Sequence, residues 1–227
     1  MKLLGIIPSR KGSKGLPGKN TKLLAGKPLI EYTINASLLA NELSGLVISS
    51  DDESVLTMGT QRKVRTIKRP SSLSGDSVPM IDVLLHSLSE VEESYDAVMV
   101  LQPTSPLRSS SDIDSAINLF INSGANSLVS VYKVDDHHPA RMYKIVDETL
   151  SPLDGNLTSV NRQDLPDIYH RNGAIYISKI DSMIKSHSIL CNHPTPYIMP
   201  LEKSVNIDNY LDFRVAEILI KDAVSRT

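Results

Sequence analysis

Short apolar runs typical of β-strands recur along the chain and alternate with longer segments of helical periodicity. The clearest run, Val98 to Leu101, is apolar at consecutive positions. Consecutive apolar positions are expected where helices cover both faces of a strand, as in a parallel sheet. The alternation of the two patterns predicts an α/β fold. The runs that we expect to be strands are 3–8, 45–50, 64–68, 97–101, 127–132 and 173–178.

Helices are expected between these runs, at residues 28–41, 77–93, 110–122 and 209–224. Residues three and four apart share one face of a helix. In the last segment the apolar residues at this spacing are Leu211, Val215, Ile218 and Leu219, with charged residues between them. We therefore predict that these residues form its buried face.

The pattern changes between about residues 135 and 172. Sustained periodicity is lost there, and prolines and glycine recur after the run Asp135-Asp136-His137-His138-Pro139. Regular alternation resumes at Gly173. We expect a main domain formed by residues 1–135 and 173–227, with residues 136–172 as an inserted arm.

Composition narrows the class of protein. With 227 residues, 41% of them apolar, the chain is expected to fold around one main core. A net charge of -2 disfavours a partner nucleic acid. The lone Cys191 excludes an internal disulfide framework and fits a reducing compartment, so we expect a cytoplasmic protein. The sequence has neither a signal-peptide segment nor an apolar run long enough for a membrane helix, which predicts no membrane association.

A glycine- and lysine-rich loop over residues 9–28 follows the first apolar run. The first 30 residues carry seven basic side chains and no acidic one. Gly12, Gly15 and Gly18 allow the backbone to bend and to bring its N–H groups close to phosphate oxygens. Arg10 and Lys19 can add charge-assisted hydrogen bonds. The loop therefore predicts a polyphosphate-binding site.

Two other interpretations of this loop are a P-loop and a solvated surface loop. The Walker A pattern G-x-x-x-x-G-K-[ST] fails, because alignment on Gly18-Lys19 puts Ser13 at the first glycine and Asn20 at the metal-binding Ser or Thr. The other alternative is a flexible, solvated lysine loop. The position of the loop at the carboxyl end of a strand disfavours it, since ligands of open α/β sheets bind there.

Two more polar segments follow strand-like runs. Gln102 and Arg108 lie in the Pro-rich segment after the run 97–101, where Gln102 could reach a nucleotide base or sugar and Arg108 could serve a phosphate or a structural ion pair. Arg69 and Asp76 follow the run 64–68. For both segments the structural alternative is a turn or a loop ion pair.

The segment Asn206-Ile207-Asp208 precedes the last predicted helix. In an extended segment, side chains two apart share a face, so Asn206 and Asp208 could bind one hard cation. The alternative is helix N-capping by Asp208 or Asn209. His137-His138 do not predict a zinc site, because neighbouring residues in an extended chain point to opposite sides. The chain contains no G-x-S-x-G motif, so a protein nucleophile is not indicated.

Taken together, the chain resembles the CMP-N-acetylneuraminate synthetases, also called acylneuraminate cytidylyltransferases, over essentially its whole length. The resemblance is carried by the segments Ile6 to Asn20, Leu101 to Arg108, His137-His138-Pro139, Arg171 to Ile177, Tyr197-Ile198-Met199 and Ile207-Asp208. It implies a Rossmann-like nucleotidyltransferase fold, with a mostly parallel mixed sheet flanked by helices and a small dimerisation arm. It also implies transfer of CMP from CTP to an acidic nine-carbon sugar.

The resemblance suggests roles for individual residues. The nucleotide-binding set is Arg10, Gly12, Ser13, Lys19, Asn20, Arg69, Asp76 and Gln102. Mg²⁺ would be held by Asp208, with Asn206 beside it, and the catalytic set is Arg10, Lys19, Gln102 and Asp208. The substrate-binding set is Gln102, Arg141, Arg162 and Tyr176; the two arginines would reach the partner's active site in a homodimer.

The chain departs from the family pattern at two places. Asn206 stands where the family often has an aspartate, and Ile189-Leu190 stand where some relatives have an aromatic pair in the sugar pocket. The preferred acyl sugar therefore stays open. A cytidylyltransferase for another acid, such as 3-deoxy-manno-octulosonate, or for a sugar phosphate, and a CTP-binding paralogue without turnover remain alternatives.

Overall fold

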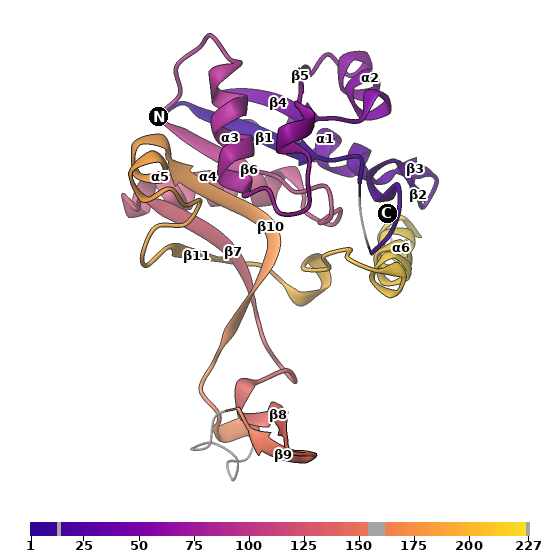
Figure 1. The fold of residues 1–227 in the computed structure, drawn as a ribbon, viewed down its shortest axis with the longest axis vertical. Coiled ribbons are helices and arrows are strands. Elements are labelled where there is room, and N and C mark those ends of the chain that lie inside the picture. The colour runs from indigo at the N-terminus through magenta and orange to yellow at the C-terminus, as the bar shows by residue number, and fades with distance from the viewer. Residues whose placement is uncertain (13–14, 154–161, 226–227) are drawn as a thin grey trace.

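The computed structural model describes residues 1–12, 15–153 and 162–225 and contains one large mixed sheet. Its strand order is β11-β7-β10-β6-β1-β4-β5 (Figure 1). The strands are β1 (Leu3–Ser9), β4 (Gly45–Ser50), β5 (Arg65–Lys68), β6 (Ala97–Val100), β7 (Ser127–Lys133), β10 (Tyr169–Lys179) and β11 (Thr195–Ile198). All the runs predicted as strands lie in this sheet, so the predicted α/β class is confirmed.

The sheet has a parallel half and a half that contains an antiparallel strand. β1 lies near the centre and pairs in parallel with β4 and β6, and β5 continues this half. β10 runs antiparallel to both β6 and β7, while β11 is parallel to β7. The carboxyl ends of β1, β4, β5 and β6 therefore lie along the same edge of the sheet, where the sequence places its polar loops.

Helices cover both faces of the sheet, which explains the continuous apolar runs. In β1, Leu3 and Ile7 join the core beneath one layer of helices, whereas Leu4 and Ile6 join the core on the other face. The first layer is α1 (Leu29–Leu38), α2 (Glu53–Gln61) and α4 (Ser110–Ser123), and the second is α3 (Met80–Ser89) and α5 (Ile180–Ser186). A strand buried on both faces carries no period-two signal, so its apolar residues run consecutively.

Three regular elements of the main fold were not predicted. α2 and α5 are short, and their few buried positions give a weak periodic signal. β11 contains a proline and lies at the edge of the sheet, where a missing N–H is tolerated. The smaller elements are the pair β2 (Leu23–Leu24) and β3 (Lys27–Pro28) and the short helices η1 (Lys19–Thr21), η2 (Ser71–Leu73) and η5 (Leu201–Lys203).

The last helix, α6 (Tyr210–Ser225), exists as predicted, but its predicted buried face is wrong. Leu211 is 71% exposed and Ile218 is 52% exposed. The helix instead buries Phe213 and Ala216 against Leu16 of the glycine-rich loop and its neighbours. Apolar residues lie on both sides of α6, and packing against the loop selects the side with the aromatic ring.

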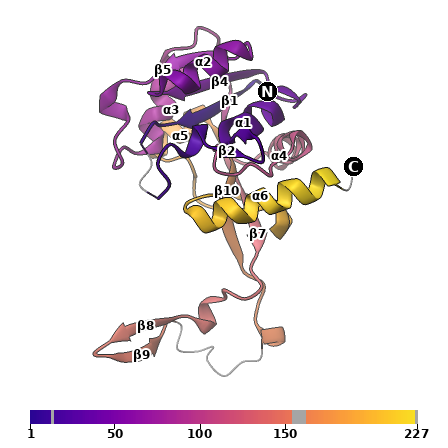
Figure 2. The same ribbon diagram turned by 90° about the vertical axis from the view of Figure 1, so that its right-hand side faces the viewer.

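Residues 134–153 and 162–168, here called the protrusion, come between β7 and β10 in the chain and extend away from the main body (Figure 1). The protrusion carries a hairpin at its far end, with η3 (Pro139–Arg141) and η4 (Arg162–Asp164) nearer the sheet; the hairpin strands are β8 (Tyr143–Val146) and β9 (Thr149–Pro152). Because β10 begins at Tyr169, residues 169–172 of the expected arm lie in the sheet. In Figure 2, α6 lies across the near side of the main body, below α1 and α4 and in front of β10.

Candidate functional site

The glycine-rich loop packs directly onto the segment before α6. Gly18 adopts a left-handed conformation, with φ of 64°, and starts the short helix η1. A Cβ atom on Gly15 would collide with the backbone carbonyl oxygen of Asp208. The two segments, which are nearly 200 residues apart in the sequence, are therefore in backbone contact. Glycine is required at residue 15 by this close approach and at residue 18 by its dihedral angle.

A cavity of about 230 Å³ opens where the loops after β1, β5 and β6 meet this segment. It brings together most of the predicted nucleotide and metal residues. Its lining is Pro8, Arg10, Gly12, Lys19, Asn20, Arg69, Met80, Gln102, Pro103, Thr104, Asn206 and Asp208. We call this space the loop cavity.

Arg10 and Asp76 form an ion pair with each other. Asp76 is not among the residues that line the loop cavity. Asn20 lies beside them and donates from Nδ2 to Ser9 Oγ at 2.8 Å and to the Arg10 carbonyl at 3.3 Å. Its Oδ1 atom is buried and accepts no hydrogen bond from a described residue. The amide oxygen of Asn20 is thus available to a donor in the cavity.

Arg69 is held rigidly at the end of β5. Its side chain donates to Ser49, from Nη2 to the carbonyl oxygen at 2.8 Å and from Nε to Oγ at 3.3 Å, and the residue is 5% exposed. Burial lowers the pKa of Arg69, and nearby Asp51 opposes that shift. The guanidinium remains a cation at neutral pH, so it contributes a fixed positive charge to the loop cavity.

Lys19 reaches across the loop cavity to the segment before α6. Its Nζ donates to the carbonyl oxygen of Ile207 at 2.6 Å and lies 3.4 Å from Asp208 Oδ1. Asn206 Nδ2 donates to Asp208 Oδ2 at 2.6 Å, which leaves Asn206 Oδ1 buried and without a partner among the described residues. An ammonium group, a carboxylate and an open amide oxygen therefore meet at one wall of the cavity.

The N-cap of α6 is formed by Asn209, one of the two capping alternatives. Asn209 Oδ1 accepts from the backbone N–H of Asp212 at 3.0 Å, and Asp212 accepts from the N–H groups of Asp208 and Asn209. The carboxylate of Asp208 does not take part in this cap. Asp208 is exposed and keeps its carboxylate at the cavity wall.

Gln102 lies between the loop cavity and two neighbouring cavities, and Gly173 gives it room. A Cβ on Gly173 would lie 3.0 Å from Gln102 Oε1 and 3.4 Å from Asn206 Oδ1. The side chain of Arg108 fixes the backbone of Gln102 and of Ala174. It donates hydrogen bonds to the carbonyl oxygens of Ala174 at 2.7 Å and Gln102 at 3.3 Å. Full burial lowers the pKa of Arg108 to about 9. Arg108 does not line the loop cavity, and its side chain is held by hydrogen bonds to neutral groups instead of the predicted ion pair, so its role here is structural.

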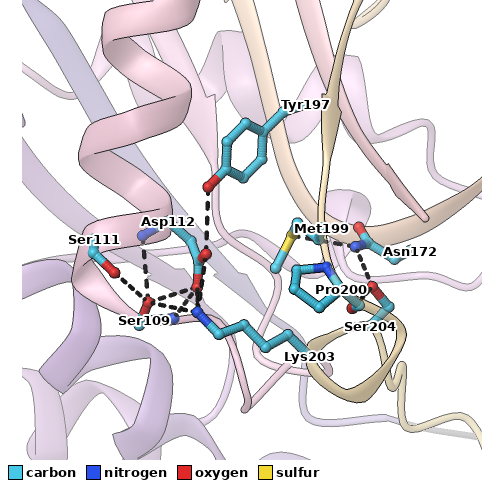
Figure 3. A network of polar contacts seen from close by, with 9 residues as sticks. All are labelled: Ser109, Ser111, Asp112, Asn172, Tyr197, Met199, Pro200, Lys203 and Ser204. Carbon is cyan, nitrogen blue, oxygen red and sulfur yellow. Dashed lines mark hydrogen bonds and ion pairs between the residues drawn. The ribbon is translucent and has the colours of Figure 1, made fainter. Parts of the chain in front are cut away.

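A polar network around the buried Asp112 and Asn172 anchors the stretch from β11 to Ser204 (Figure 3). Lys203 Nζ forms an ion pair with Asp112 at 2.9 Å, and Tyr197 Oη donates to the same carboxylate at 3.3 Å. Burial raises the pKa of Tyr197 to about 12, and the charge of Asp112 adds to that shift. Asn172 Nδ2 donates to Ser204 Oγ at 3.0 Å. The segment that carries Asn206 and Asp208 is thereby tied to α4 and β10.

Tyr176 lies outside the loop cavity, in a neighbouring cavity of about 360 Å³ that shares Gln102 and Met80 with it. We call this the acceptor cavity. Its lining is Met80, Ile81, Val100, Gln102, Arg171, Tyr176, His187, Ser188, Ile189 and Leu190. Burial raises the pKa of Tyr176, and the charge of Arg171 opposes that shift.

Among the described side chains, those of Asp76 and Arg141 are the predicted site residues that do not line these cavities. Arg141 lies in the protrusion and forms an ion pair with Asp136. Arg162 begins η4, also in the protrusion, and its side chain is outside the described structure. Ser13 lies outside the described residues.

Sequence reasoning missed Arg171 and Thr104 as site residues. Arg171 belongs to a segment that carries the resemblance, but the residue itself shows no sign that it lines a cavity. The signal that exists is Gly173, since a glycine inside a strand pattern indicates a bulge.

Within the described residues, no group of three or more His, Cys, Asp or Glu side chains is arranged to hold a metal. No helix in the described part of the chain is both long and apolar enough to cross a membrane.

Comparison with solved structures defines the class. The fold matches that of a CMP:2-keto-3-deoxy-manno-octonic acid synthetase complexed with CTP, with a TM-score of 0.74 and 17% identity, over 98% of this chain and 100% of that one. At this identity the likeness shows the fold alone. It is an α/β nucleotidyltransferase fold, as predicted.

The family follows from the sequence comparisons. The chain belongs to the cytidylyltransferase family, whose model matches residues 4–205. It is 32% identical to an N-acylneuraminate cytidylyltransferase of Escherichia coli O18:K1:H7, over 95% of this chain and 51% of that protein. It is 33% identical to a CMP-N,N'-diacetyllegionaminic acid synthase of Legionella pneumophila, over 97% of both. The chain thus spans about half the length of the first relative, and the predicted resemblance is confirmed.

Proposed function

We propose that this chain transfers CMP from CTP to the anomeric hydroxyl of a nonulosonic acid, the sugar class that includes sialic acid, and releases pyrophosphate. The observation that supports this best is the loop cavity, where Arg10, Lys19 and Arg69 face Asn206 and Asp208. The names of the relatives, which act on N-acylneuraminic and N,N'-diacetyllegionaminic acids, agree with this assignment.

The cations of the loop cavity would bind the triphosphate. Arg69 is fixed by Ser49 and needs no reordering to meet a phosphate. Arg10 and Lys19 are paired with carboxylates in this structure, so each would exchange its partner for phosphate oxygens when CTP enters. Backbone N–H groups near Gly12 add to this positive field.

The oxygens of Asn206 and Asp208 fit a divalent cation. Asn206 Oδ1 is buried with no donor among the described residues, and Mg²⁺ prefers carboxylate and amide oxygens. These two residues would hold Mg²⁺, which when bound neutralises phosphate charge and lowers the pKa of a nearby hydroxyl. Because Asn206 carries no charge, Asp208 contributes the single negative charge of this pair.

The chemical step is attack of the sugar hydroxyl oxygen on the α-phosphorus of CTP. The bond from that phosphorus to the pyrophosphate oxygen breaks, pyrophosphate leaves with that bonding pair, and the hydroxyl proton passes to water. Such transfers depend on positioning and charge stabilisation more than on a protein nucleophile. Gln102, which borders both cavities, would orient the sugar toward the α-phosphate, with Tyr176 as the pocket wall behind it.

A homodimer with shared active sites is part of the proposal. The hairpin of the protrusion exposes large apolar side chains, with Ile145 at 78% and Leu150 at 67%. Large apolar side chains that are exposed to this extent favour an interface with another protein chain. Arg141 and Arg162 in the same protrusion would reach the sugar in the partner's site.

The direct test is pyrophosphate release from CTP and Mg²⁺ with a panel of sugar acids. The panel contains N-acetylneuraminic, N,N'-diacetyllegionaminic and pseudaminic acids, with 3-deoxy-manno-octulosonate as the competitor of another class. We expect release with at least one nonulosonic acid and less with the competitor. Calorimetric binding of CTP without turnover on any acid would instead select a non-catalytic paralogue.

A further inference from the structure

Strand β10 is interrupted by a bulge next to the acceptor cavity. Arg171 pairs with Val131 of β7, and the next recorded pair is Tyr176 with Val129. The chain thus advances five residues along β10 for two along β7. Extra residues on one strand bend it and turn its side chains to new directions.

The bulge is held by a buried asparagine and a glycine. Asn172 is 2% exposed, and its Oδ1 accepts from Ser130 Oγ at 2.6 Å and from the N–H of Ala174 at 3.1 Å. Gly173 adopts φ of 75°, which other residues rarely do. Both amide atoms of Asn172 are thus hydrogen-bonded within the protein, so the bulge is a fixed feature.

The bulge changes the side of the sheet on which the side chain of Arg171 lies. Residues five apart on a regular strand point to opposite faces. Here Arg171 and Tyr176 line the acceptor cavity together, and they also line a third cavity that includes Asn206 and Asp208. The bulge therefore brings a cation to the side of the sheet where Gln102 lies.

The acceptor cavity otherwise has a largely apolar wall, formed by Met80, Ile81, Val100, Ile189 and Leu190. The backbone of Arg171 pairs with β7, but its guanidinium forms no hydrogen bond or ion pair with a described residue. A guanidinium with open donors at the mouth of such a cavity suits a planar anion, which it can bind through two parallel hydrogen bonds.

We propose that Arg171 binds the carboxylate of the acceptor sugar from within the same chain, which rests on the function proposed above. In a nonulosonic acid the carboxylate is attached to the carbon that bears the attacking hydroxyl. A carboxylate on Arg171 therefore puts that hydroxyl beside Gln102, at the border with the loop cavity. The apolar wall then receives the acyl-bearing end of the sugar.

Equilibrium binding separates this role from turnover. Calorimetry would measure binding of N-acetylneuraminic acid, N,N'-diacetyllegionaminic acid and their C1 methyl esters to the full chain saturated with a CTP analogue that has a methylene α,β-bridge. The variants are Arg171→Gln and Arg171→Lys, with Arg141→Gln and Arg162→Gln for comparison. Circular dichroism and thermal unfolding establish that each variant is folded.

We expect Arg171→Gln to weaken binding of the preferred acid about 10- to 100-fold, the effect of losing a hydrogen bond to a charged group, without changing affinity for the CTP analogue. Arg171→Lys should recover part of this loss. The methyl ester should bind the natural chain weakly and be insensitive to Arg171→Gln.

Unchanged acid binding by Arg171→Gln, an equal loss for the ester, or no binding of either acid by the natural chain would overturn the assignment. A loss of acid binding that is confined to Arg141→Gln and Arg162→Gln would also overturn the assignment. If pyrophosphate is released but Arg171→Gln binds acid normally, this inference fails and the proposed function stands. If acid binding depends on Arg171 but no pyrophosphate is released, the proposed function fails instead.

Discussion

A methyl group added at Gly173 should reduce both stability and activity, for separate reasons. The residue has φ of 75°, and the left-handed conformation costs an alanine about 1–2 kcal/mol. For a domain of this size, each kcal/mol lowers Tm by about 2–4 °C. We therefore expect Gly173→Ala to unfold about 2–8 °C below the natural chain, as measured by calorimetry.

The loss of activity comes from the space that the methyl group would occupy. Its carbon would lie 3.0 Å from Gln102 Oε1, which must therefore shift by a few tenths of an ångström, and 3.4 Å from Asn206 Oδ1, which is van der Waals contact and leaves the amide no room to move closer. A misplacement of 1 Å in an active site can cost about 100-fold in rate. We expect kcat/KM for the sugar acid, measured by pyrophosphate release, to fall about tenfold.

Gly124→Ala is the matched control. Gly124 ends α4 with φ of 66°, and a Cβ there would have no neighbour within 4 Å. Its substitution should lower Tm by a similar amount and leave kcat/KM unchanged. If Gly173→Ala has the same kcat/KM as the natural chain, the role of Gly173 in making room for Gln102 and Asn206 is refuted. An equal fall in both variants would mean that backbone strain alone explains the result.

Four further predictions follow from the site and the protrusion. Lys19→Ala should raise the KM for CTP about 10- to 100-fold, through loss of hydrogen bonds to phosphate, with the oligomeric state unchanged; normal CTP kinetics would contradict the role of the loop. Asn206→Asp adds a carboxylate to the pair, so the Mg²⁺ concentration for half-maximal activity should fall, and an unchanged value would argue against a metal at this position. Lys203→Met should lower the free energy of unfolding at pH 7 by about 1–2 kcal/mol, because Lys203 is partly exposed while Asp112 is buried. Burial acts to raise the pKa of Asp112, but hydrogen bonds from its neighbours outweigh it and the pKa is lowered, so the stabilisation is present above the ordinary carboxyl pKa and lost as pH falls through the folded value. A difference from the natural chain that does not shrink as the pH is lowered from 7 into the acid range in urea titrations would contradict this account. Ile145→Asp places a charge on the exposed hairpin and should shift the chain to monomers in sedimentation experiments, whereas an unchanged mass would remove the hairpin from the interface.

The sequence by itself determined the class of fold and the main parts of the loop cavity. Strands buried on both faces appear as continuous apolar runs, and a loop with glycines, cations and no carboxylates has few uses other than binding an anion. Because parallel strands share one carboxyl edge, Lys19, Arg69 and Gln102 could be expected to meet there. These features are local, or depend only on strand direction.

The tertiary structure decided what depends on packing between distant segments. The sequence predicts the wrong buried face for α6, because both sides of the helix carry apolar residues. Only the contact with Leu16 decides that the side with Phe213 is buried. Lys19 meets Ile207 and Asp208 because Gly15 allows two backbones to touch. Arg171 joins Tyr176 only through a bulge whose residues are hydrogen-bonded to other strands and loops. Side-chain direction after a bulge is fixed by such long-range contacts, and a periodic pattern along one strand contains no record of them.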